Sequence, residues 1–97
     1  MIRPHDVLNE WARQKGLLIH REDTQPFRAY YYISQQDCTF QVVVEPEING
    51  TIRIDAHLIE GLDGISEHYV VIMSSDCLRA ALDIIQGLID QWFAEGR

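Results

Sequence analysis

The residues best suited to chemistry lie in the segment TIRIDAHLI, where Asp55 and His57 stand two positions apart and Arg53 precedes them. Successive side chains of a β-strand point to opposite faces, so these three share one face. There a carboxylate could orient an imidazole for general acid/base work. His68 follows in the next apolar segment and could add a second imidazole.

Candidate nucleophiles beside this constellation are restricted to Thr39 and Tyr30. A flat strand surface also lacks the cleft that encloses most substrates. The glycines punctuate loops and helix ends apart from Gly87, and they form no phosphate-binding loop. We therefore expect no enzyme and no nucleotide cofactor.

Metal-ligand spacings such as H-x₃-H or C-x₂-C do not occur in the chain. The histidines are scattered singly: His5, His20, His57 and His68. A pair of His57 with His68 or Glu67 across adjacent strands stays open, but we expect no metal. The two cysteines, Cys38 and Cys77, each fall on an apolar side of their element, which predicts buried thiols in a reducing compartment.

The element that must position these residues is a closing helix over Asp76–Phe93. At 100° per residue its apolar side chains cover one half of the cylinder. They are Leu78, Ala81, Leu82, Ile85, Leu88, Ile89, Trp92 and Phe93, with Cys77 and Ile84 at the edge. So wide an apolar arc needs a sheet as its partner.

The rest of the chain supplies a second helix and that sheet. Pro4 at a first helical position and Gly16 after the last predict a helix over Pro4–Lys15. Five strands are expected over Leu17–Glu22, Phe27–Ser34, Cys38–Glu45, Thr51–Ile59 and Glu67–Ser74. Their short connections favour an antiparallel meander with both helices on one face. We predict a single α+β domain over residues 1–97, a two-layer sandwich.

Strand registers follow from keeping apolar side chains on one face. A two-residue type I′ turn at Asn49-Gly50 would mix the faces, so we predict a three-residue loop, Ile48-Asn49-Gly50, with Gly50 left-handed. This loop pairs Val44 with Ile54 and Val42 with Ala56. A second turn over Gln35–Asp37 places Tyr32 beside Thr39, and Tyr30 beside Gln41 and then His57.

Helices on one side leave the other side of the sheet, here called the open face, free to meet a partner. The expected fifth strand, over Glu67–Ser74, should add Tyr69, Val71 and Met73 to the open face. Tyrosines, arginines and aliphatic side chains together resemble an interface core, although they are also good strand formers. The predicted partner-binding residues are Arg28, Tyr30, Tyr32, Glu45, Glu47, Arg53, Asp55, His57, Glu67 and Tyr69. Glu47 and Glu67 belong to acidic clusters at the two ends of the sheet, and either the open face or such an acidic edge stays open as the contact surface.

Charge narrows the kind of partner. The net charge is −7, and residues 37–97 hold three basic and eleven acidic groups. Such a field disfavours nucleic acid and anionic lipid and attracts a basic protein, although acidity also serves solubility. No apolar run approaches the roughly 20 residues of a membrane span. We expect a cytoplasmic protein.

Size, acidity and element order together resemble the small cytoplasmic immunity proteins that neutralise nuclease toxins in bacterial competition. The resemblance covers the whole chain and implies a non-catalytic inhibitor of a basic toxin, with no residue role carried over. The chain is also similar to type III secretion chaperones, which implies the alternative of a homodimeric adaptor that uses the open face. Those chaperones place a helix where Ile48-Asn49-Gly50 leaves no room.

Overall fold

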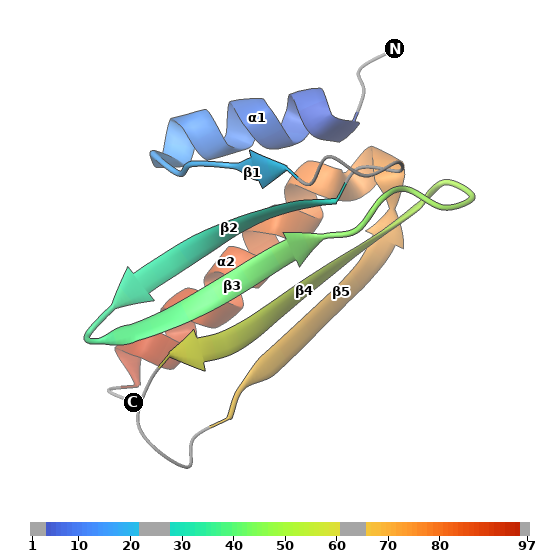
Figure 1. Cartoon of the computed structure of the whole chain (residues 1–97). Helices are drawn as coiled ribbons and strands as arrows, with labels where there is room; N and C mark the ends of the chain where they lie inside the picture. The colour runs from blue at the N-terminus through green and yellow to red at the C-terminus, as the bar shows by residue number, and fades with distance from the viewer. Residues whose placement is uncertain (1–3, 22–27, 61–65, 96–97) are drawn as a thin grey trace.

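A computed structural model describes residues 4–21, 28–60 and 66–95 of the 97-residue chain. Its elements, drawn in Figure 1, are α1 (Pro4–Lys15), β1 (His20–Arg21), β2 (Ala29–Gln35), β3 (Cys38–Val44), β4 (Thr51–Glu60), β5 (His68–Ser74), a 3-10 turn (Ser75–Cys77) and α2 (Leu78–Ala94). The five strands form one sheet in the order β1-β2-β3-β4-β5, and every neighbouring pair is antiparallel. The predicted α+β meander between two helices is confirmed. No helix within the described ranges is long and apolar enough to cross a bilayer.

The apolar arc of α2 covers the inner face of the sheet, as predicted (Figure 1). Its buried residues are Leu78, Ala81, Leu82, Ile85, Ile89, Trp92 and Phe93. They meet strand residues at every second position, including Phe40, Val42, Ile52 and Ile54, all of which are buried. Phe40 contacts Trp92 and Phe93 edge-on, with ring centroids 5.2 and 5.8 Å apart.

Helix α1 lies on the same side of the sheet and is tied to α2. Trp11 is fully buried and donates from Nε1 to Asp83 Oδ1 over 2.8 Å. Its ring also packs on Tyr31 of β2, with centroids 5.7 Å apart. One indole thus joins both helices to the inner face.

Cys38 is buried, as expected, but Cys77 is exposed, and both thiols are free. The expectation of a second buried thiol is wrong because residues 75–77 form a 3-10 turn, so that α2 begins at Leu78. That tighter turn rotates Cys77 away from the α-helical arc.

The β2–β3 hairpin differs from the predicted register. Gln36 and Asp37 both have positive φ, 52° and 64°, so they form a two-residue turn that pairs Gln35 with Cys38. The strands are therefore shifted by two positions. Tyr32 lies opposite Gln41 and Tyr30 opposite Val43, whereas each side chain keeps its predicted face.

In the β3–β4 hairpin the predicted register is confirmed, with Val44 opposite Ile54 and Val42 opposite Ala56. The predicted turn is wrong, because Asn49 and Gly50 have φ of 52° and 75° and Ile48 pairs with Thr51. Glu45 N bonds Arg53 O at 2.9 Å, so residues 46 and 47 stand opposite residue 52 alone. This bulge at Pro46 reconciles the two-residue turn with the register.

The remaining strand bounds shift at their ends. β1 is shorter than expected, and Leu18 before it is 74% exposed. The predicted strand ends Glu22 and Phe27 lie outside the described residues.

The hydroxyl of Tyr31 destabilises the core. Its side chain is fully buried, and its hydroxyl has no hydrogen-bond partner among the described residues. Burial raises the pKa of this hydroxyl well above its ordinary value. A buried hydroxyl without a partner is destabilising.

Tyr31→Phe is expected to raise the free energy of unfolding by about 1 kcal/mol, because it removes the unpaired hydroxyl and keeps the ring. Urea titration measures the change. Tyr32→Phe, at an exposed position of the same strand, serves as the control and should be near neutral. A clear loss of stability in Tyr31→Phe would show that the hydroxyl has a partner after all.

Candidate functional site

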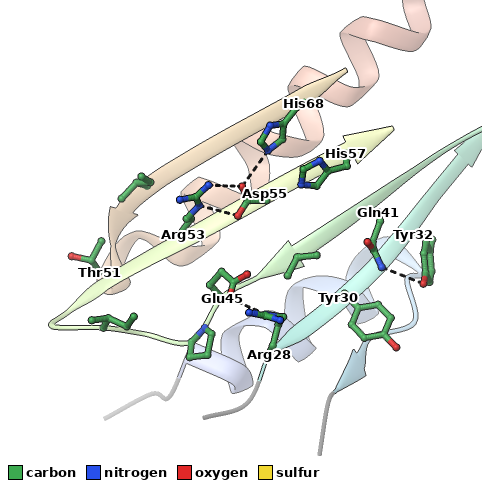
Figure 2. Close-up of a pocket in the computed structure, with 14 residues that line it drawn as sticks. Arg28, Tyr30, Tyr32, Gln41, Glu45, Thr51, Arg53, Asp55, His57 and His68 are labelled. Atoms are coloured by element: carbon green, nitrogen blue, oxygen red, sulfur yellow. Dashed lines mark hydrogen bonds and ion pairs between the residues drawn. The ribbon is translucent and has the colours of Figure 1, made fainter. Parts of the chain in front are cut away.

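The open face is concave, and its centre forms a hollow of about 1010 Å³ bounded by β2, β3, β4 and β5. Figure 2 shows the side chains that line it. They are Arg28, Tyr30, Tyr32, Gln41, Val43, Glu45, Pro46, Ile48, Thr51, Arg53, Asp55, His57, His68 and Ile72. Most of the predicted partner-binding residues are therefore brought together in one place.

Tyr69 is not among them, and its placement on the open face was wrong. It stands opposite Ala56 on the inner face and packs beside Phe40, with ring centroids 6.1 Å apart. Val71 and Met73 likewise pack against the core. Residues directly opposite in a sheet share a face, and β5 pairs these three with the buried side of β4.

The opposite alternation of β5 turns His68, Val70 and Ile72 outward. Val70 is 41% and Ile72 60% exposed. The predicted acidic residues Glu47 and Glu67 lie outside the hollow, since Glu47 is exposed beside the β3–β4 turn and Glu67 precedes β5.

Asp55 is the centre of the polar part of the hollow. It is only 7% exposed, and within the described ranges no other charged residue is buried. Arg53 donates two hydrogen bonds to its carboxylate, from Nε to Oδ2 over 2.9 Å and from Nη2 to Oδ1 over 3.0 Å. His68 Nε2 lies 3.2 Å from the same Oδ1 (Figure 2).

These contacts decide the ionisation of the carboxyl group. Burial alone would raise the pKa of Asp55, but hydrogen bonds from Arg53 and His68, together with their charges, lower it below its ordinary value. In return, the hydrogen bond and charge of Asp55 raise the pKa of Arg53. The pair is fixed as carboxylate and guanidinium, so Asp55 is a poor proton carrier at neutral pH.

His57 is not the partner of Asp55 that its spacing suggested; His68 has that role. Instead, the His57 ring stacks on His68 with centroids 4.0 Å apart and an interplanar angle of 13°. The two residues are directly opposite in β4 and β5. Leu58 N bonds Glu67 O, so Leu58 and Glu67 form a hydrogen-bonded pair of the ladder. The neighbouring pair, His57 and His68, is therefore non-hydrogen-bonded, and in such pairs side chains approach most closely.

The other end of the open face is aromatic. Tyr30 stacks on His20 of β1 at 5.1 Å and meets Tyr32 edge-on at 5.9 Å. Between the two ends, Arg28 Nε bonds Glu45 Oε2 at 2.9 Å. The alternation of the short first strand places His20 on the open face, so the sequence contained a signal for it. Only the register of β1 against β2, which the structure supplies, shows that His20 lies opposite Tyr30.

Comparison with protein-family models, with curated protein sequences and with solved structures yields no match.

Asp55→Asn is expected to lower the free energy of unfolding by about 1–3 kcal/mol near neutral pH, because Arg53 and His68 lose a charged acceptor. The folded-state pKa of Asp55 is depressed, so its contribution is complete above the unfolded value of about 3.9 and disappears as pH falls through the folded value. Urea midpoints of both proteins from about pH 5 to about pH 2 should therefore converge.

Asp37→Asn is the matched control, because Asp37 is exposed in a turn with positive φ that asparagine also tolerates. It should show no such convergence. A wild-type advantage over Asp55→Asn that persists at the acid end would contradict the role given to the Asp55 charge.

Proposed function

We propose that this chain is a non-catalytic protein-binding inhibitor of the immunity type, and that the open face is the surface that holds its basic partner. The observation that supports this most directly is the composition of the hollow. Tyrosine, arginine and histidine side chains share it with the exposed aliphatic residues Ile48 and Ile72. Tyrosine and arginine are the residue types that most often dominate binding energy at protein interfaces.

Preorganisation favours the same reading. Tyr30 is held between His20 and Tyr32, and Gln41 Nε2 donates to the Tyr32 hydroxyl over 3.4 Å. Arg28 and Arg53 are each fixed by a carboxylate. Side chains that are already ordered lose little conformational entropy on binding.

The charge distribution supports attraction of a basic partner from a distance. Within the hollow Arg28 is bonded to Glu45 and Arg53 to Asp55, so local charge is balanced. The net charge of −7 therefore comes from acidic residues outside the hollow, among them Glu47, Glu60 and Glu67. Such a field accelerates encounter more than it strengthens the final contacts.

Catalysis by Asp55 and His57 has less support. Asp55 is held by Arg53 and His68, and Thr39, one suggested nucleophile, is hydrogen-bonded to Ser34 at 2.8 Å and does not line the hollow. Tyr30 does line it, but stacks on His20.

The test uses the product of the gene beside this one as the partner. We expect a tight complex whose association rate falls as salt is raised, because screening weakens the attraction of opposite charges. Tyr30→Ala with Tyr32→Ala should weaken binding by about 2 kcal/mol or more, as measured by surface plasmon resonance. Gln91→Ala, at an exposed position of α2, is the control and should bind like wild type.

Absence of a complex, or an association rate that is independent of salt, would contradict the basic-partner proposal. If the double tyrosine variant bound the partner as tightly as wild type, the contact surface would not include the aromatic part of the open face. Protection of growth against the partner's toxicity separates an inhibitor from a mere binding protein.

A second candidate, a homodimeric adaptor, is favoured by the edge of the sheet. Among the described residues no strand lies beyond β5, which spans His68–Ser74 without lysine or proline. Leu58 N bonds Glu67 O and Ser75 N bonds Gly50 O, so by alternation the backbone groups of His68, Val70 and Ile72 point away from β4. Unprotected apolar edges are ready to pair with another strand.

Ile72→Lys is expected to abolish such a dimer, because natural edges use lysine to block pairing. Ile84→Lys is the matched control, since Ile84 is 45% exposed on α2 and Ile72 is 60% exposed on β5. Light scattering at micromolar concentration gives the mass of each protein. A wild-type monomer, or a dimer that persists in Ile72→Lys, would count against this candidate.

A further inference from the structure

Three potential metal ligands meet where β4 and β5 lie side by side. Ligand atoms of Asp55, His57 and His68 all lie within 4.8 Å of one another. They come from adjacent strands, and Figure 2 shows the two imidazoles and the carboxylate on the same side of the sheet. The sequence left a pair of His57 with His68 across adjacent strands open, and the pairing of β4 with β5 brings these two residues together with Asp55.

The distance between two of the ligand atoms suits a single ion. Zinc binds imidazole nitrogen and carboxylate oxygen at about 2.0–2.1 Å, so two tetrahedral ligands stand about 3.3 Å apart. His68 Nε2 and Asp55 Oδ1 are separated by 3.2 Å. An ion can therefore take the place of the proton between them without moving either strand.

His57, which lies on β4 with Asp55 and opposite His68 of β5, is the third ligand. It is exposed, and the His68 side chain is 42% exposed, so neither ring is locked by packing. The present stack, with rings 4.0 Å apart, needs a rotation of the His57 imidazole before one of its nitrogens reaches the point between His68 Nε2 and Asp55 Oδ1. Rotation of exposed side chains is rapid and costs little.

Arg53 would act as the support of the carboxylate. Its Nε bond to Asp55 Oδ2 is 2.9 Å and leaves Oδ1 to the ion, provided that the 3.0 Å bond from Nη2 to Oδ1 lengthens. Carboxylates that bind metals are commonly oriented by such a second hydrogen bond. The positive charge of the guanidinium lowers the affinity, so moderate rather than very tight binding is expected.

We propose that Asp55, His57 and His68 form a site for one zinc ion, with the fourth coordination position turned toward the hollow. Two imidazoles and one carboxylate suit zinc and its transition-metal neighbours, whereas calcium and magnesium prefer oxygen ligands. Three protein ligands with an open fourth position are also an arrangement that zinc adopts in proteins. The site does not depend on whether the open face binds another protein.

Isothermal titration calorimetry of the full chain with zinc chloride, in a buffer that does not chelate metals, tests the site. We expect one ion per chain and a higher melting temperature with zinc, because the ion binds the folded state. Cobalt(II) in place of zinc should give the intense visible absorption of tetrahedral coordination. His57→Gln and His68→Gln should each weaken binding at least as much as loss of an outer-shell partner, about 10–100-fold.

His20→Gln is the matched control, because His20 lies on the same face at the opposite edge of the sheet. It should bind zinc like wild type, and circular dichroism should show all three variants folded. A wild-type protein that binds neither zinc nor cobalt(II) would overturn the proposal. Unchanged zinc affinity in the double variant His57→Gln with His68→Gln, or equal losses in His20→Gln, would also overturn it.

Discussion

Burial of the apolar arc of α2 against one face of the sheet is the constraint on which the rest of this structure depends. Leu82, Ile85 and Ile89 are fully buried there, and β3 and β4 turn every second side chain toward them. Trp11 brings α1 to the same layer through its bond to Asp83. Because both helices are on one side, the alternate side chains of the strands are left on a face that no helix of the described residues covers (Figure 1).

Asp55 shows how that uncovered face remains ordered. A nearly buried carboxylate is unfavourable unless it is paired, and here the fork of Arg53 and the imidazole of His68 satisfy it. The bond to His68 crosses from β4 to β5, so a contact that satisfies the carboxylate also links the edge strand to the sheet. Asp55 and Arg53, at the centre of the open face, are thus held in fixed positions by their paired hydrogen bonds.

The open face has two chemically distinct ends. Tyr30, Tyr32 and His20 form an aromatic group over β1 and β2, which suits contact with another protein. Asp55, His57 and His68 gather nitrogen and oxygen ligands over β4 and β5, which suits a metal ion. The two groups use different residues, so an ion bound at one end would leave the aromatic end uncovered.

The sequence by itself determined the elements and the layer order, because these depend on local signals. The periods of 3.6 and 2 in its apolar residues predict α2, β3 and the β3–β4 register, and Pro4 and Gly16 mark the ends of α1. Tertiary structure decided the rest. A shift of two residues keeps every side chain on its face, so the pattern could not distinguish the β2–β3 register. The apolar run from Tyr69 to Met73 fits either face of β5, and only pairing with β4 sent Tyr69 inward and His68 to Asp55.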